Sequence, residues 1–200
     1  MKKFYLVLMA ALFITIPFQV FAQSTTWKMD KAHTSVKFEV EHLTISFVFG
    51  QFMDFDGSAV SDKSDFTDAK VDFTVETKSI NTNVEMRDKD LRSPRFLDAD
   101  KYPQMKFKSK AVRKLSKSKY ILTGYLTIKD VTKLVNFDVT YKGTVIDPMG
   151  NTRTGCRATL VINRFDYNVN YKEKFGKNAW AVAPEVKIII DTEFIKNKSS

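Results

Sequence analysis

Histidine and cysteine, two residue types that often bind transition metals or act in catalysis, are scarce in this chain. Two histidines are present, His33 and His42, nine residues apart on what the flanking pattern predicts to be one early strand. Side chains separated by an odd number of residues along a strand point to opposite faces, so this pair is not expected to share a metal ion. Cys156 is the single cysteine, and no neighbouring residue activates its thiol. We therefore expect no metal site, and we expect Cys156 to be a buried strand residue.

Motifs of catalysis and of phosphate binding are missing from the sequence. There is no nucleophile elbow, no P-loop and no glycine fingerprint for a dinucleotide. Asp98 and Asp100 form an acidic pair, but such pairs on a surface loop are usually solvated. A triad assembled from distant residues would leave no such motif. On balance the sequence predicts a protein that is not an enzyme, with no catalytic residue and no cofactor.

Basic side chains gather in one segment. Arg87, Lys89, Arg92 and Arg95 follow one another closely, with Lys101 nearby. Such a run is often only a solvated face. The planar guanidinium of arginine nevertheless donates two parallel hydrogen bonds to a phosphate group, which suits it to a diphosphate. The cluster is therefore a candidate for binding an anionic head group.

The elements that would position these residues are mostly strands. Apolar side chains alternate with polar ones over many short runs, which is typical of strands with one buried face and one solvated face. The apolar positions of these runs are Val36, Phe38 and Val40; Ile45, Phe47, Phe49, Met53 and Phe55; Val71, Phe73 and Val75; Leu122, Leu126 and Ile128; Val135, Phe137, Val139 and Tyr141; Ala158, Leu160 and Ile162; and Val186, Ile188, Ile190 and Phe194. Turn residues between the runs favour antiparallel hairpins. We expect an all-β protein of about eight strands that close into a barrel, because closure removes exposed edges.

One segment departs from the strand pattern, at residues 84–97. It predicts a short helix over residues 84–93, with Asn81 or Asn83 as the N-cap and Pro94 beyond its end. Leu91, Phe96 and Leu97 offer an apolar side for packing. A helix this short is stable only when it packs on other structure, so we expect the segment to cap one mouth of the barrel.

The first residues have the features of a secretory signal peptide. Two lysines precede an apolar stretch, and Ala22 provides a small residue at the cleavage point. A membrane span is the rival interpretation, but a proline and two polar residues interrupt the run that crossing a bilayer requires. We expect residues 1–22 to be a signal peptide cleaved after Ala22. Residues 23–200 are then expected to form a single domain in the periplasm.

Charge and aromatic content narrow the partners. The net charge of +9 suits nucleic acid, an anionic membrane or an anionic ligand, and export makes nucleic acid the least suitable of the three. The chain holds 17 phenylalanines, and an eight-stranded barrel is either filled by such side chains or holds one small ligand. These residues alone leave both alternatives open. In either case Phe38, Phe73 and Phe137 are expected to face the interior, because each lies within an alternating run.

Several short sequence motifs occur in order along the chain. They are Asp30-Lys31-Ala32-His33-Thr34-Ser35-Val36, Val40-Glu41-His42-Leu43, Gly50-Gln51-Phe52, Ser79-Ile80-Asn81-Thr82, Arg87-Asp88-Lys89-Asp90-Leu91-Arg92-Ser93, Tyr102-Pro103, Gly124-Tyr125-Leu126-Thr127-Ile128, Val131-Thr132-Lys133 and Arg164-Phe165-Asp166-Tyr167. In this combination they resemble the YceI family of periplasmic lipocalin-like proteins, over residues 26–194.

The resemblance implies an extended, antiparallel, eight-stranded lipocalin-like barrel whose hydrophobic cavity binds a polyisoprenoid chain with a diphosphate or quinone head. The sequence departs from the usual family pattern at four positions. Asp90 replaces a usual histidine, Asp130 and Asn168 stand where glycine is common, and Leu134 stands where proline is common. The residues expected to bind the ligand are Phe38, Phe49, Phe73, Leu91, Phe96 and Phe137, with Arg87 and Arg92 at the head.

Three functions are therefore expected to compete. The first is an exported carrier or sequestering protein for an isoprenoid lipid, which performs no chemistry. The second is a hydrolase or isomerase that acts on lipid, and the third is an accessory protein of a membrane respiratory or stress-response system. The expected partner is a polyisoprenoid lipid and not nucleic acid. Transient contact with a membrane surface and assembly as a homodimer both stay open.

Overall fold

Antiparallel strands make up most of the chain, as the alternation predicts. The structure is a computed structural model that describes residues 24–176 and 179–197. The expected signal peptide, with its cleavage site after Ala22, lies outside the described residues. In chain order the strands are β1 (Thr26–Met29), β2 (Ser35–His42), β3 (Ser46–Phe52), β4 (Phe55–Val60), β5 (Lys70–Glu76), β6 (Ile80–Asn81), β7 (Gln104–Lys114), β8 (Lys119–Ile128), β9 (Val131–Ile146), β10 (Thr152–Asn163), β11 (Lys174–Phe175), β12 (Ala179–Trp180) and β13 (Val182–Lys196). The helices are α1 (Glu85–Arg92) and the 3-10 turns η1 (Lys31–His33), η2 (Thr77–Ser79) and η3 (Arg164–Tyr167).

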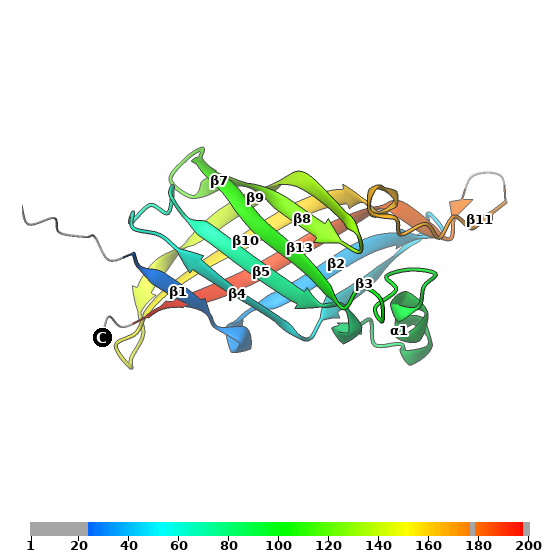
Figure 1. Cartoon of the computed structure of the whole chain (residues 1–200), viewed down its shortest axis with the longest axis horizontal. Coiled ribbons are helices and arrows are strands. Elements are labelled where there is room, and N and C mark those ends of the chain that lie inside the picture. Colours follow the sequence, from blue (N-terminus) through cyan, green and yellow to red (C-terminus); the bar gives the residue numbers. More distant parts are fainter. Residues whose placement is uncertain (1–23, 177–178, 198–200) are drawn as a thin grey trace, which may run out of the picture.

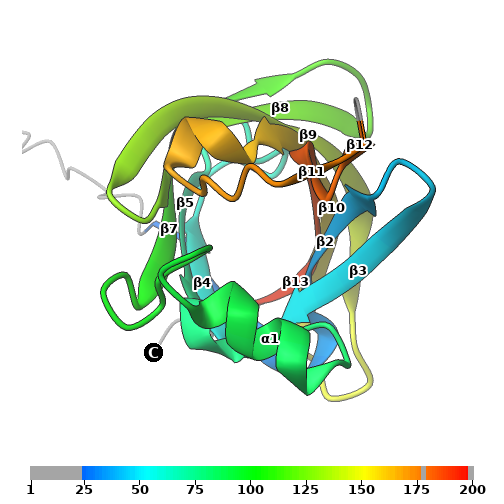
Figure 2. The ribbon, with the colours of Figure 1, turned by 90° about the vertical axis from the view of Figure 1, so that its right-hand side faces the viewer.

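Eight strands close into one antiparallel barrel, which Figure 1 shows from the side and Figure 2 from one end. Three of these strands are interrupted along their length, so that β1 continues as β2, β3 as β4, and β5 as β6. The other five are β7, β8, β9, β10 and β13. β13 completes the circle because it pairs with β10 along one edge and with both β1 and β2 along the other. Closure satisfies the strand edges, and the predicted all-β barrel is confirmed.

The pairing of β2 with β3 corrects one prediction. Phe38 is opposite Gly50 and Val40 is opposite Val48, so the even-numbered residues of this hairpin share the inner face. Phe49 is opposite Glu39 on the outer face, and 64% of it is exposed. The prediction of one alternating strand with a buried Phe49 is therefore wrong. In β3 the inward residues have even numbers, whereas in β4, after the break, they have odd numbers. A rule that assumes strict alternation cannot predict such a change.

The strand segments of the barrel that were not recognised in the sequence include β1 and β7. In β7, Met105 and Phe107 alternate with lysines, but the run then reaches Ser109 and a bulge before Ala111. The bulge interrupts the period of two on which recognition depends. β1 has only four residues, too few for a period to be visible.

Two segments lie over the same end of the barrel (Figure 2). One is α1 with the residues that follow it, and the other, here called the strap, comprises residues 164–176 and 179–181, with η3, β11 and β12. α1 ends at Arg92, and Pro94 lies beyond its end, as predicted. The predicted asparagine cap is wrong, because the N-cap is Val84 and makes no side-chain hydrogen bond. Among the described residues, no helix is long and apolar enough to cross a membrane.

Candidate binding cavity

Side chains from all eight barrel strands line a cavity of about 220 Å³. Its wall is almost wholly apolar, because the inward residue of each alternating pair is a hydrophobic one. Phe38, Phe73 and Phe137 line it, which confirms that these three residues face the barrel interior. Other lining residues were not among those expected to bind the ligand, although all of those named next except Phe107 belong to the predicted alternating runs. Among them are Phe107, Leu126, Ala158, Ile188 and Ile190.

Two aromatic rings of the wall pack against glycines on neighbouring strands. A Cβ at Gly124 would lie 2.4 Å from the ring of Phe107, and a Cβ at Gly50 would lie 2.3 Å from the ring of Phe38. Only glycine leaves room for a ring laid across the neighbouring strand in this way. Phe107 in turn meets Phe137 edge to face, with ring centroids 5.2 Å apart. A glycine inside a strand pattern was therefore a usable signal for where the rings lie.

Cys156 also lines the cavity, on the same face of β10 as Ala158. It is partly buried, as a residue beside a cavity is, and burial raises the pKa of its thiol to about 12. At neutral pH the thiol is therefore protonated and a poor nucleophile. The predicted inward placement is confirmed, and the environment gives the thiol no chemical activation.

At the α1 end the cavity is covered by a hydrophobic cluster. Phe96, Tyr167 and Val169 are buried there against wall residues that include Phe107 and Leu126. Leu91 and Leu97 pack on the same cluster, as predicted for the apolar side of residues 84–97. The rings of Phe96 and Tyr171 lie 4.8 Å apart, so the α1 segment and the strap meet above the lumen. Leu91 and Phe96 therefore belong to the cover, whereas the cavity wall itself is formed by strand residues.

Arg164 holds the strap in place. Its buried guanidinium, only 4% exposed, donates to four backbone carbonyl oxygens at 2.6 to 2.9 Å. These are the carbonyls of Val169, Tyr171, Val182 and Ala183. Burial lowers the pKa of Arg164 to about 10, which leaves it charged at neutral pH. The sequence motif that contains Arg164 is thus explained by the need to hold the strap over the end of the barrel.

A second contact joins the strap to the α1 segment. The ammonium of Lys129, in the turn between β8 and β9, donates to the carbonyl oxygens of Phe96 at 3.2 Å and Asn168 at 3.0 Å. Asn168 has a left-handed backbone (φ 58°), which asparagine tolerates better than most residues. Its side chain donates to Asp130 at 3.2 Å. Two of the positions that depart from the usual family pattern therefore contact each other.

The predicted head-group arginines make hydrogen bonds within the protein. Arg87 donates through Nε to the hydroxyl of Thr82 at 2.7 Å and through Nη2 to its carbonyl at 2.9 Å. Arg92 donates to the carbonyls of Lys78 at 2.9 Å and Ile80 at 2.8 Å. Both arginines therefore position the chain that leads into α1. Within the described structure these bonds use two of the five N–H donors of each guanidinium.

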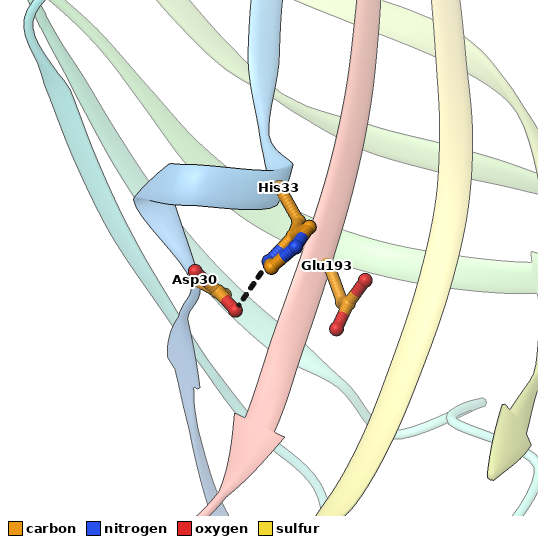
Figure 3. Close-up of side chains that lie close together, drawn as sticks. All are labelled: Asp30, His33 and Glu193. Carbon is orange, nitrogen blue, oxygen red and sulfur yellow. Dashed lines mark hydrogen bonds and ion pairs between the residues drawn. The ribbon is translucent and has the colours of Figure 1, made fainter. Parts of the chain in front are cut away.

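A polar cluster lies at the opposite end of the barrel (Figure 3). Single ligand atoms of Asp30, His33 and Glu193 lie within 4.8 Å of one another, an arrangement that could hold a metal ion. Arg153 already supplies the positive charge, since its Nη1 donates to Asp30 and Glu193 at 2.6 Å each. Its Nε donates to Asp147 at 2.6 Å. The group is thus an ion-pair network that joins β10 and β13 to the residue that follows β1. Its members are too far apart in the sequence for a local pattern to reveal them.

This network predicts an acid-dependent stability. Hydrogen bonds from Arg153 hold the pKa of Asp147 and of Asp30 below the ordinary value of 3.8. Carboxylates of this kind stabilise a fold above their unfolded pKa, and the contribution is lost as the pH falls through the lower folded pKa. We expect Arg153→Met to lower the melting temperature at pH 7 and the difference from wild type to narrow below about pH 4.

A matched control lies four residues along β10. Arg157 pairs with Asp191 through two bonds of 2.6 and 2.9 Å, but its side chain is 52% exposed. Exposed pairs contribute little, so Arg157→Met should change the melting temperature less than Arg153→Met. Equal shifts for the two variants at pH 7, or a gap that persists at low pH, would contradict the role given to Arg153.

Comparison with known proteins agrees with the resemblance found in the sequence. The YceI-like domain family matches residues 27–194. The UPF0312 protein PC1_2518 of Pectobacterium carotovorum is 36% identical over 179 residues, which cover 88% of this chain and 90% of that protein. Protein YceI of Salmonella newport is 35% identical over 179 residues, with the same coverage of both chains.

Solved structures share the barrel. Crystal structures of BcnA from Burkholderia cenocepacia and of the YCEI protein from Campylobacter jejuni match with TM-scores of 0.71 and 0.64, at 24% and 26% identity. The first match covers 82% of this chain and 98% of BcnA, and the second covers 80% and 90%. A polyisoprenoid binding domain from Saccharophagus degradans matches with a TM-score of 0.64 at 10% identity, over 86% of this chain and 98% of that domain. With its fold shared and its sequence matched from residue 27 to residue 194, the chain belongs to the YceI family.

Proposed function

We propose that this protein is an exported carrier that holds one long apolar ligand, a polyisoprenoid lipid, inside its barrel and performs no chemistry on it. The observation that carries the proposal is the cavity: about 220 Å³ of space with an almost wholly apolar wall, covered at the α1 end. A wall that exposes almost no polar surface favours a hydrocarbon chain, because burying an unpaired polar group there is costly. The polyisoprenoid binding domain of Saccharophagus degradans, which has the same fold, supports the choice of ligand class.

The two competing functions lack a comparable supporting observation. A hydrolase or isomerase acting on lipid needs a general base or a nucleophile at the ligand, and the protonated thiol of Cys156 offers neither. An accessory protein of a respiratory or stress-response system would need no cavity. A space of about 220 Å³ inside the barrel is an unusual feature in a closely packed protein, and its presence favours the carrier.

Export supplies the setting for such a carrier. A signal peptide at residues 1–22, cleaved after Ala22, would deliver the barrel to the periplasm, between two membranes. Transient contact with a membrane surface would then load and unload the lipid, with no nucleic acid involved. A homodimer is compatible with this role but is not required by it.

The head of the ligand is proposed to lie at the α1 end. Phe38, Phe73 and Phe137 would contact the chain. Arg87 and Arg92 would contact an anionic head with the N–H donors that are not bonded to residues 78–82. Leu91 and Phe96 would cover the chain where it leaves the lumen.

This placement predicts a ligand-dependent effect of Arg87→Ala. We expect the variant to weaken the binding of an isoprenoid diphosphate by roughly 1.5–3 kcal/mol, the usual value of a hydrogen bond to a charged group, and to affect the neutral alcohol much less. The measurement is a binding titration with each ligand. Arg113→Ala, an exposed arginine on β7, is the control. An equal loss for both ligands, or no loss for either, would leave Arg87 as a residue that only positions the cover.

The experiment that tests the carrier function is to purify the protein from the periplasm of the organism that makes it and to extract any bound lipid. Organic solvent should release an isoprenoid lipid at about one molecule per barrel, identified by mass spectrometry. A lipid-free protein that also fails to take up isoprenoids in a titration would contradict the proposal. Chemical conversion of an added lipid would favour the enzymatic alternative.

A further inference from the structure

An aromatic cluster lines the cavity at the end away from α1. Phe66 lies at its centre, with its ring centroid 5.3 Å from that of Trp27 and 5.9 Å from that of Tyr141. Tyr120 packs on Tyr141 at 6.4 Å. All four residues line the cavity. We call this cluster the floor, and Phe66 is its one member that does not belong to a barrel strand.

Phe66 reaches the floor from the loop of residues 61–69, between β4 and β5. Its backbone has a φ of 58°, in the left-handed region that bulky side chains seldom adopt. Two hydrogen bonds fix it there, from the Phe66 amide to the carbonyl of Lys63 and from the Ala69 amide to the carbonyl of Phe66, both at 3.1 Å. A turn that needed only φ > 0 would be formed more easily by glycine. The presence of phenylalanine at this position therefore indicates that its ring has a specific role.

The rest of the loop is held by its own acidic side chains. Asp68 accepts hydrogen bonds from the hydroxyl of Ser61 at 2.6 Å and from the amide of Asp62 at 2.9 Å. Asp65 accepts from the hydroxyl of Thr67 at 2.8 Å and pairs with a lysine of β7 at 3.7 Å. A loop fixed from within in this way can keep a strained residue in place. It presents the Phe66 ring to the lumen as a rigid stop.

We infer that Phe66 sets the length of apolar chain that the cavity accepts. This inference rests on the proposed function, because it concerns the far end of the same ligand. A chain that enters from the α1 end extends along the apolar wall until it meets the floor. The floor residues on β1, β8 and β9 are anchored in the barrel, whereas the Phe66 ring can be removed without breaking any strand pairing. Removing it should lengthen the cavity at that end.

The test uses the full mature chain stripped of lipid and a series of prenyl alcohols that differ by one isoprene unit, namely geraniol, farnesol, geranylgeraniol and geranylfarnesol, with solanesol as a much longer member. In wild type, the affinity should rise with each added isoprene unit until the chain reaches the floor, and then stop rising. In Phe66→Ala, the rise should continue for at least one more unit, with a gain of about tenfold at the first unit beyond the wild-type limit. Phe66→Gly should behave in the same way. It also relieves the left-handed strain, which guards against a variant that fails to fold.

The control is Leu115→Ala, at the same end of the barrel. Leu115 is 50% exposed and does not line the cavity, so its variant should keep the wild-type limit. If folded Phe66→Ala and Phe66→Gly proteins stop at the same chain length as wild type, Phe66 is only a packing residue and the inference is wrong. If wild type binds none of the alcohols, the proposed function fails instead. The two failures are therefore distinguishable.

Discussion

Ala158→Phe is expected to abolish binding of an isoprenoid chain while the barrel stays folded. Ala158 lines the cavity near the middle of β10, opposite Val139 on one side and Ile190 on the other. A phenyl ring at this position projects into the lumen and occupies space that the chain needs. Each buried methylene contributes about 0.8 kcal/mol, so excluding four of them costs about 3 kcal/mol, or more than 100-fold in affinity.

The matched control lies three residues along the same strand. Val161 faces outward and is 56% exposed, so Val161→Phe adds the same ring outside the barrel. Titration of both lipid-free variants with geranylgeraniol, together with thermal unfolding, separates blockage from misfolding. A folded Ala158→Phe protein that binds the alcohol as wild type does would show that the ligand is not in this cavity.

Arg164→Met is expected to lower the free energy of unfolding by about 4 kcal/mol or more, because four buried carbonyl oxygens would lose their donor and each such loss costs about 1–3 kcal/mol. The bonds run from η3 to the rest of the strap and to the start of β13. An apolar side chain of similar length keeps the packing but donates nothing. A loss of this size is a large share of the stability of an ordinary domain.

Urea unfolding of wild type, Arg164→Met and Arg164→Lys measures this effect. Lysine keeps the charge but cannot reach four carbonyls in the planar geometry of a guanidinium, so it should recover only part of the stability. Arg113→Met removes an exposed arginine and should change the stability by less than about 0.5 kcal/mol. A loss of 1 kcal/mol or less for Arg164→Met would contradict the role of Arg164 in holding the strap.

The barrel was predictable because alternation is a local property of a strand. Phe38, Phe73 and Phe137 line the cavity as predicted, since each lies within an uninterrupted run. Phe49 was misplaced because β3 and β4 are separated by a break. The prediction assumed that the inward positions stay the same on both sides of it. β7 escaped recognition for a related reason, the bulge after Ser109.

The polar contacts were not predictable, because they join residues that are far apart in the chain. Arg153 is separated from Asp30 by 123 positions and from Glu193 by 40. No pattern within one strand marks such partners. Arg87 and Arg92 were recognised as a basic cluster, yet their bonds to residues 78–82 depend on how the loop before α1 folds. Phe66 gave no signal either, since a left-handed φ at a phenylalanine goes against its local preference.

The central claim is that an apolar chain lies along the lumen of the barrel. Photo-cross-linking tests it most directly, with a prenyl alcohol that carries a diazirine on its terminal isoprene unit, followed by peptide mapping. The account predicts cross-links on inward residues of the strands, such as Phe73, Phe137 and Ile188, and their loss in Ala158→Phe. Cross-links confined to outward residues, such as the exposed Phe47 and Phe49 of β3, would contradict it and would place the lipid on the outer surface.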